Sequence, residues 1–509
     1  MLFNNERQGT GVLMRAYQLW LIMLMGLVCG AAKAGVWSVT PRLGASEILT
    51  DNINLSHENK KEEYITRLAP GVVVKAVGNM LNMDLNYGLE HLVYNKGSRG
   101  DATFSQMQGD LAMDLVKNSL SFNATSTLRQ ELVDTQNRII LDNLSSASRS
   151  TVLAYNMGPT LRNHFGTYAS SDMSFRFGKV KYSNTNLLSN STITNVGIGV
   201  ESGRYFKNLE WNINYHNSMT QKESAKSSGI EELSGALSAQ LSPHMRGLVR
   251  GGYQNDDIQD RTGINNGYFL SAGLIWQPST RITLDGTFGR NNKDANIAIN
   301  PSRRTSFRFG YLDRDVGLNA GTIWSLSLLH HTRMSTWDIG YEEDTTNTQL
   351  LEFSGARTLI SGGGGGGGGG VVVNPSATFS QADEDFIRKT MHVNLSFQST
   401  KSTLNITSTA ERRDFEKNTG DEKVAGVNLS WEWRLNVRSS SIVSAGLLNR
   451  HFRATKLDDK FRYAALSLNR QLQEKLTASI DFRHIERDNS SNIDAYQENR
   501  LTLGVNKLF

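Results

Sequence analysis

The segment 427–437 alternates apolar and polar residues without a break, and this alternation constrains the fold more than any other feature of the chain. Its apolar positions are Val427, Leu429, Trp431, Trp433, Leu435 and Val437. A period of two is typical of a β-strand with one apolar face and one face in contact with water. The intervening Asn, Ser, Glu and Arg side chains could not form a dry core, so the two faces need different surroundings.

The same alternation recurs along the chain, for example at residues 209–215, 268–276, 282–288, 391–397 and 476–482. Repeated strands of this kind, separated by turns, are typical of a β-sandwich or a barrel. We count about 22 strands, within a range of about 18 to 24, because strand boundaries read from a sequence shift by a few residues. Bacterial single-chain barrels usually have an even number of strands, which would place both termini on the periplasmic side.

The first residues have the features of a secretory signal peptide. Two arginines precede an apolar stretch at residues 19–28, and Ala32 and Ala34 provide the small residues of a cleavage site. We therefore expect residues 1–34 to be a signal peptide that is cleaved after Ala34, with translation starting at Met1 or Met14. The apolar stretch is shorter than the roughly 20 residues of a transmembrane helix.

The cysteine, histidine and charge contents argue against several chemistries. Cys29 is the only cysteine and lies in the expected leader, so the mature chain has no thiol for a disulfide, a nucleophile or a thiolate metal site. His330 and His331 are adjacent, and in a strand they point to opposite faces. The net charge of +5 gives no support for a nucleic-acid partner. We expect no catalytic residue, metal site or cofactor.

Two architectures fit a secreted chain of alternating strands: a soluble periplasmic sheet protein, and a closed barrel that presents its apolar face to lipid. A sheet that spans a membrane must close on itself, because lipid cannot satisfy unpaired backbone groups. The strand at 427–437 has the length that crosses the hydrocarbon layer. Aromatic residues at or near strand ends would form the interfacial girdles of such a barrel: Trp276, Trp324, Trp337 and Tyr341. We therefore predict a large antiparallel transmembrane β-barrel in the outer membrane of a Gram-negative bacterium.

The C-terminus resembles the assembly signal of Gram-negative outer-membrane proteins. Leu501, Leu503, Val505 and the terminal Phe509 alternate with polar residues, and Lys507 interrupts the pattern. This resemblance implies that the barrel assembly machinery and outer-membrane lipid are partners of the chain.

The alternation fades between Tyr341 and Met391, and this gap contains nine consecutive glycines at 362–370. Polyglycine has high backbone freedom and no side chains to bury. The tract lacks the lysine of a phosphate-binding loop. We therefore divide the mature chain into barrel residues 35–350, a Gly-rich segment at 351–388, and barrel residues 389–509. The segment is either a plug or gate inside the barrel or a simple mobile insertion.

The polar faces of the strands supply candidates for the barrel lumen. Carboxylates and arginines alternate there with apolar neighbours, which favours a polar lumen over an acid/base pair. The candidate lumen-lining residues are Glu432, Arg434, Asp481, Arg483 and Arg500. Three Asn-x-Ser/Thr triplets, at Asn394, Asn405 and Asn428, lie on polar faces, and we interpret them as lumen residues, not glycan acceptors.

Short segments distributed along the chain carry a family resemblance. They are TDNINL at 50–55, APG at 69–71, LNY at 85–87, TIW at 322–324, TW at 336–337 and ENRLTL at 498–503. In this order they resemble the PEP-CTERM system-associated outer-membrane protein family. The resemblance covers most of the mature chain, and the nine-glycine tract departs from it. It implies an outer-membrane barrel in bacteria that make exopolysaccharide, and it supplies no catalytic residues.

The resemblance and the polar strand faces together predict a porin-like conduit or scaffold in exopolysaccharide export. Its further partners would be the exopolysaccharide and the periplasmic and inner-membrane export proteins. Two other functions remain open from the sequence: an outer-membrane rim enzyme, such as a hydrolase or a lipid- or polysaccharide-modifying enzyme, and a soluble periplasmic binding protein.

Overall fold

The computed structural model of the protein describes residues 35–132, 144–145, 149–183, 188–257, 266–317, 320–354, 379, 383–415, 421–452, 457–490 and 495–509. In this part of the chain 24 strands and one short helix follow one another. The elements are β1 (Gly35–Thr50), β2 (Glu63–Gly78), β3 (Leu81–Tyr94), β4 (Ala102–Val116), β5 (Leu120–Leu132), β6 (Arg149–Phe165), β7 (Ala169–Tyr182), β8 (Ser191–Ser202), β9 (Leu209–Lys222), β10 (Ser228–Ser242), β11 (Met245–Asp256), β12 (Gly267–Ser279), β13 (Ile282–Arg290), β14 (Asn292–Ser302), β15 (Thr305–Arg314), β16 (Gly321–His331), β17 (Ser335–Asn347), α2 (Thr348–Phe353), β18 (Asp385–Gln398), β19 (Ser402–Phe415), β20 (Asp421–Asn436), β21 (Ser439–Phe452), β22 (Leu457–Gln473), β23 (Leu476–Asn489) and β24 (Tyr496–Leu508).

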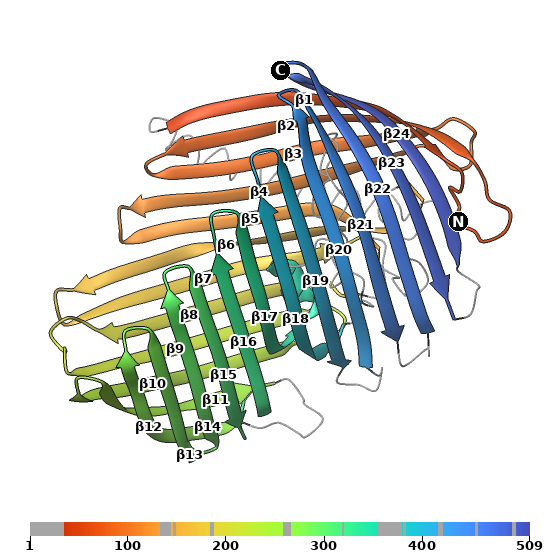
Figure 1. The fold of residues 1–509 in the computed structure, drawn as a ribbon. Helices are drawn as coiled ribbons and strands as arrows, with labels where there is room; N and C mark the ends of the chain where they lie inside the picture. Colours follow the sequence, from red (N-terminus) through yellow and green to blue (C-terminus); the bar gives the residue numbers. More distant parts are fainter. Residues whose placement is uncertain are drawn as a thin grey trace.

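The strands form one closed antiparallel barrel, as the alternation predicts. Each strand pairs with the next along the chain, and β1 pairs with β24 from Thr50 opposite Arg500 to Arg42 opposite Leu508 (Figure 1). The 24 strands of the described residues lie at the upper end of the expected range. Tight connections explain why strands are undercounted from sequence: Asn291 alone joins β13 to β14, in a left-handed conformation with φ 57°.

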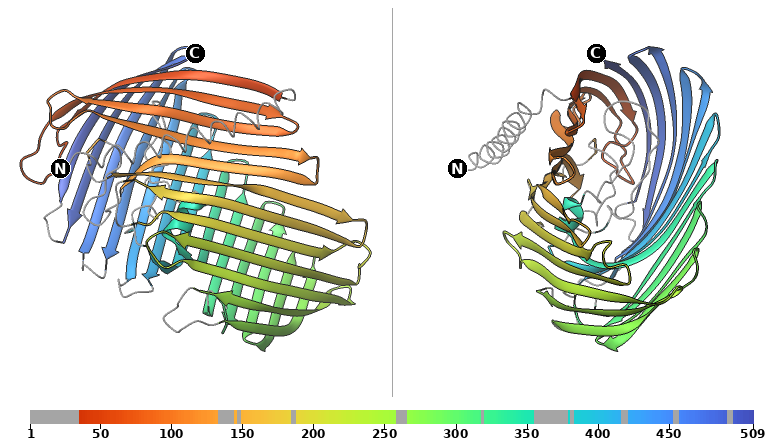
Figure 2. Two further views of the ribbon diagram at one scale, coloured as in Figure 1. Left: turned by 180° about the vertical axis from the view of Figure 1, so that it is seen from behind. Right: turned by 90° about the vertical axis from the view of Figure 1, so that its left-hand side faces the viewer.

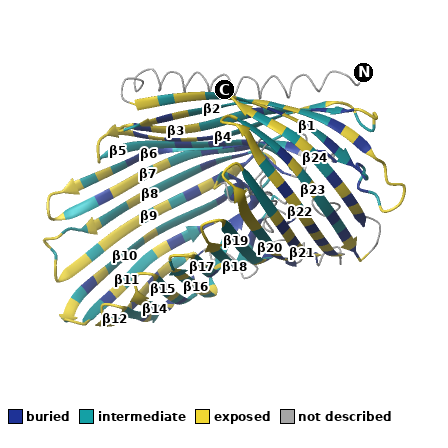
Figure 3. Ribbon diagram, turned by 45° about the horizontal axis from the view of Figure 1, so that its top comes forward, coloured by how far each residue is buried: buried dark blue, intermediate teal, exposed yellow. Residues whose placement is uncertain are grey.

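The apolar face of the strands points out of the barrel. Trp431 is 40 % exposed and Ile480 is 50 % exposed, whereas their sequence neighbours on the other face point inward. Exposed and buried residues alternate along most strands (Figure 3). The exterior is therefore the apolar surface that a lipid-facing barrel requires. Among the described residues, no α-helix has the length and hydropathy of a membrane span.

The connections at the two ends of the barrel differ in length. At one end, which we call the short-turn end, residues 243–244, 437–438 and 474–475 each join two strands. At the other, the long-loop end, the connections include residues 51–62 and 348–384. Gly35 and Phe509 both lie at the short-turn end, where the Phe509 amide donates a hydrogen bond to Pro41 O at 2.9 Å. Short turns are periplasmic in bacterial barrels, so this arrangement agrees with the expected side of the termini.

Two sequence-based boundaries need correction. β17 continues to Asn347 and β18 begins at Asp385, so the interruption between strands runs from 348 to 384 instead of 351 to 388. For the same reason Tyr341 lies in the middle of β17 and not near its end. Trp276 and Trp337 lie near the short-turn ends of β12 and β17, and Trp324 lies near the long-loop end of β16, as girdle residues would. The expected leader and the nine glycines lie outside the described residues.

Buried apolar residues gather on the inner face of the barrel toward the long-loop end. One cluster joins residues of β20 to β24 with Leu55 and Phe379: Val424, Leu448, Phe461, Tyr463, Ile485 and Tyr496. A second lies on β1 to β3 and the neighbouring connections: Ile48, Ile53, Ile65, Leu92, Tyr94 and Leu144. The interior at this end is therefore packed against chain that lies inside the barrel.

Candidate functional site in the barrel lumen

The strand register places all five predicted lumen residues on the inner face. Glu432 on β20 and Asp481 on β23 share one row of the sheet, linked through Ile442 and Ser467. Arg434 lies one step nearer the short-turn end, and both β20 residues are exposed. These residues form no single cluster, because two strands separate β20 from β23.

Arg483 and Arg500 do come together, as directly opposite residues of β23 and β24. Arg500 is buried and donates hydrogen bonds from Nη2 and Nε to Glu498 Oε1, at 2.6 Å and 3.1 Å. Thr50 of β1 donates to the same carboxylate oxygen at 2.6 Å. This pair therefore lies at the seam where the first and last strands close the barrel.

The sequence analysis missed a network of fully buried charges on the same wall. Arg450 of β21 and Arg487 of β23 both bind Asp459 of β22, with Arg487 Nε 2.8 Å from Asp459 Oδ1. Arg413 of β19 donates to Glu411 at 2.7 Å. Burying a charge is costly unless it is paired and hydrogen-bonded, so these contacts stabilise the inner wall only as an intact set. Their inward positions could be read from the strand alternation, but their pairing could not.

The helix α2 leaves the end of β17 and crosses to the opposite wall. Asn347 caps it, because its side chain accepts a hydrogen bond from the Leu350 amide at 2.9 Å. Glu352 of the helix forms an ion pair with Arg129 of β5. Asn156 of β6 donates to Phe353 O at 3.3 Å. Figure 2 shows the helix inside the barrel, against strands far from β17 in the sequence.

The Phe353 ring explains why residue 178 on the facing wall is a glycine. Phe353 packs with the buried cluster of β6 to β8, and its ring lies beside Gly178 of β7. A Cβ atom at this glycine would lie 2.3 Å from Cε2 of the ring, closer than such atoms approach. The inner face of β7 is therefore shaped to accept α2.

Asp383, near the other end of the connection between β17 and β18, forms hydrogen bonds with the same wall of the barrel. The Asp383 carboxylate accepts hydrogen bonds from the amide and hydroxyl of Ser189 and from the Gln349 side chain. Lys222 of β9 donates to Asp383 O at 3.2 Å. Asn347 also reaches Ser228 of β10, at 3.3 Å. Both ends of the segment therefore contact strands from the far side of the barrel.

Phe379 lies against the opposite wall, β19 to β24. It is fully buried in the cluster of β20 to β24 side chains. The Arg413 guanidinium lies 4.0 Å from the centre of its ring, within the range of a cation–π contact, and 4.6 Å from the ring of Phe386. The described parts of the segment 348–384 therefore touch inner faces on both sides of the lumen.

Within the ranges that the structure describes, no three His, Cys, Asp or Glu side chains converge as a metal site would need. Asn394, Asn405 and Asn428 lie on inner faces, as predicted, and Asn428 accepts a hydrogen bond from Tyr463 at 2.9 Å. The expectation of a non-enzymatic role stays a prediction.

The fold is that of a large single-chain antiparallel barrel with an apolar exterior and a polar, partly filled interior. No protein-family model matches the sequence, and a search of curated proteins finds no match. Among solved structures, the siderophore receptor PirA of Pseudomonas aeruginosa is similar at 8 % identity, with a TM-score of 0.41, 92 % of this chain covered and 80 % of that one. A mutant of the ferric enterobactin receptor PfeA of the same organism shares 11 % identity, with a TM-score of 0.44 and coverages of 93 % and 80 %. The FrpB iron transporter of Neisseria meningitidis shares 11 % identity, with a TM-score of 0.42 and coverages of 94 % and 83 %.

Proposed function

We propose that the protein is an outer-membrane conduit whose lumen is plugged by α2, Phe379 and Asp383 of the connection between β17 and β18, and that it serves exopolysaccharide export linked to the PEP-CTERM system. The observation that carries the conduit is the contact of one connection with both inner walls: α2 and Asp383 with β5 to β9, and Phe379 with β19 to β24. A surface loop would leave those inner faces free. A plug must touch both.

The polar inner face suits a hydrated cargo. Glu432, Arg434 and Asp481 point into the lumen, and a sugar polymer can pass such a surface while its hydroxyl groups stay solvated. The choice of exopolysaccharide rests on the family resemblance of the sequence. Energy for export would come from a periplasmic or inner-membrane partner.

Single-channel recording in planar bilayers tests the plug. The full chain is compared with the double variant Glu352→Gln, Asp383→Asn, which removes the carboxylate anchors of the segment and leaves the barrel wall unchanged. We expect rare, small openings in the unaltered chain and frequent, larger openings in the double variant. The matched control is Glu210→Gln, since Glu210 faces the lumen near the short-turn end and pairs with Arg246 at 2.7 Å, away from the segment.

The possible outcomes separate the parts of the proposal. Equal, stable conductance in both proteins would show an open barrel and overturn the plug. The absence of conductance in both, with insertion verified, would overturn the conduit. Normal surface exopolysaccharide in a clean deletion strain would overturn the export role and leave the conduit untouched.

A further inference from the structure

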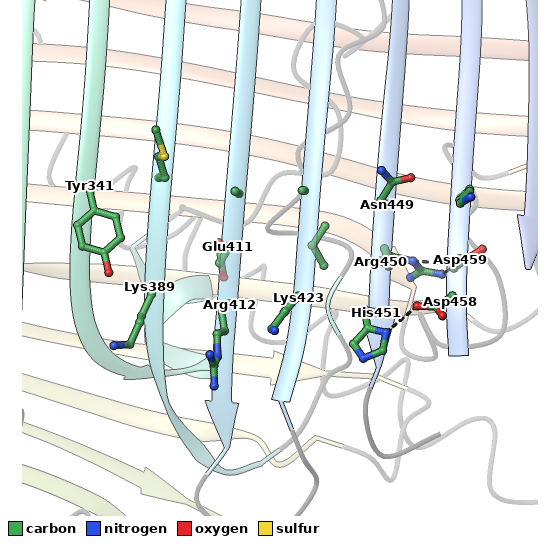
Figure 4. Close-up of a pocket in the computed structure, with 15 residues that line it drawn as sticks. Tyr341, Lys389, Glu411, Arg412, Lys423, Asn449, Arg450, His451, Asp458 and Asp459 are labelled. Atoms are coloured by element: carbon green, nitrogen blue, oxygen red, sulfur yellow. Dashed lines mark hydrogen bonds and ion pairs between the residues drawn. The ribbon is translucent and has the colours of Figure 1, made fainter. Parts of the chain in front are cut away.

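Four consecutive strands present basic side chains in a single row on the outer face of the barrel. Lys389 of β18 lies opposite Arg412 of β19, Arg412 lies opposite Lys423 of β20, and Lys423 lies opposite His451 of β21. We call these four residues the basic row. Figure 4 shows them on the near side of the ribbon, with Glu411 and Arg450 behind it.

The row lies where the apolar exterior ends toward the long-loop end of the barrel. The next row toward the short-turn end contains Met391, Ala410 and Ala425 on β18 to β20 and continues with Asn449 and Lys460 on β21 and β22. A cavity of about 600 Å³ spans the two rows, with Tyr341 at one side and Lys460 at the other. The cavity therefore has basic side chains toward the long-loop end and apolar side chains of β18 to β20 toward the short-turn end, with Asp458 and Lys460 at its β22 side.

Within the row, basic side chains lie directly opposite one another on neighbouring strands. Like charges directly opposite each other on neighbouring strands are destabilising. Acidic neighbours accompany three of the four members: Glu343 lies 3.0 Å from Lys389, Asp414 and Asp421 lie 2.8 Å and 2.6 Å from Arg412, and Asp458 lies 2.6 Å from His451. Lys423, between Arg412 and His451, has no acidic partner among the described residues. An anion over the centre of the row would supply the missing counter-charge.

We propose that the basic row binds the phosphate groups of a lipid in the outer leaflet, with the acyl chains lying along the apolar surface below Met391 and Ala425. Cationic side chains at the level of lipid headgroups attract anionic lipid, at about 1 kcal/mol for each charge. The inference rests on the membrane orientation proposed above and is independent of the plug. Its site faces away from the lumen, so neither result can be mistaken for the other.

Binding is measured by native mass spectrometry of the detergent-purified full chain. The probes are a diphosphorylated glycolipid (lipid A), the same glycolipid without its phosphates, and inorganic phosphate. We expect the phosphorylated lipid to bind more tightly than the dephosphorylated one, and millimolar inorganic phosphate to leave it bound. Lys423→Gln should weaken binding about fivefold, and the triple variant Lys389→Gln, Arg412→Gln, Lys423→Gln about a hundredfold.

Arg470→Gln is the matched control, because Arg470 is exposed on the same wall of the barrel, on β22 near the short-turn end. Its affinity should match that of the unaltered chain. Equal affinity for the two glycolipids in the unaltered chain would overturn the proposal even if the triple variant fails to fold. Displacement of the lipid by inorganic phosphate would overturn the lipid as the source of the phosphate, and unchanged binding by a folded triple variant would overturn the site.

Discussion

Arg129 on β5 and Glu352 in α2 form an ion pair although 223 positions separate them in the sequence. The Glu352 side chain is fully buried, and the Arg129 side chain is also close to Glu131 of the same strand. This contact joins the wall of the first strands to the connection that follows β17. It links the barrel wall directly to the helix that lies inside it.

Replacing Glu352 by Gln should loosen α2 without unfolding the barrel. Removing one member of a buried ion pair costs about 3 to 5 kcal/mol, because the other charge loses its partner. Here the cost falls on the docking of the helix, since Arg129 keeps Glu131. Hydrogen exchange of the amides of residues 350–354 should accelerate, while the exchange of β5 and β17 stays as before. Unchanged exchange in α2 would contradict the anchoring role of the pair.

Phe379 should be inaccessible from outside the barrel. The only cysteine of the full sequence, Cys29, lies in the expected leader, so a single cysteine can be introduced and labelled in the processed chain. A Phe379→Cys variant should react with an impermeant maleimide about tenfold more slowly than Glu58→Cys, since Glu58 is exposed in the connection between β1 and β2. Equal labelling rates would place residue 379 at the surface.

The inner-wall charges should dominate the stability of the last strands. Asp459→Asn removes the carboxylate that the buried Arg450 and Arg487 share, and breaking a buried ion pair in this way costs about 3 to 5 kcal/mol. The neighbouring variant Asp458→Asn is its control: this side chain is 64 % exposed on the outer face and pairs with His451, and an exposed pair contributes about 1 kcal/mol or less. Heat-induced unfolding, followed by electrophoretic mobility, should shift to clearly lower temperature for the first variant alone. Equal shifts would show that the buried network contributes little.

Glu432 and Arg434 should influence ion selectivity in opposite directions. Both are exposed on the inner face of β20 near the short-turn end. In the Glu352→Gln, Asp383→Asn background, Glu432→Gln should reduce the preference for cations, and Arg434→Gln should increase it. The reversal potential in a salt gradient measures both effects. Identical reversal potentials in all three proteins would mean that ions do not pass these side chains.

Phe509 should matter for assembly and little for the finished barrel. The residue is 53 % exposed, its ring lies 4.8 Å from Lys507 Nζ, and its backbone amide donates a hydrogen bond to Pro41 O of β1. Phe509→Ala should lower the amount of folded protein in the membrane several-fold, while the protein refolded from denaturant melts at an unchanged temperature. A lower melting temperature with normal assembly would show that the residue is structural instead of a signal.

Much of the outer surface could be predicted from the chain, because the side-chain direction in a strand depends only on local geometry. The apolar positions from Val427 to Leu435 all point outward, and Glu432, Arg434, Asp481, Arg483 and Arg500 all point inward. The single-residue connection at Asn291 hides the boundary between β13 and β14, because one residue is too short to show the polar composition by which a turn is recognised.

Contacts inside the barrel could not be predicted in the same way. Arg450 and Asp459 are nine positions apart on neighbouring strands, and a shift of one residue in their register would move one of them to the other face. Arg129 and Glu352, or Arg413 and Phe379, meet only because a connection turns into the barrel. No local pattern in the sequence shows the path of that connection.

The sequence by itself determined which side chains face lipid and which face the lumen, since the pleat of a strand alternates them whatever the strand pairs with. The tertiary structure alone decided that β1 meets β24, that Lys389, Arg412, Lys423 and His451 share a row, and that α2 and Phe379 lie against the inner faces. These relationships depend on register and curvature accumulated over all the strands. The two-residue alternation of apolar and polar positions contains no information about register or curvature.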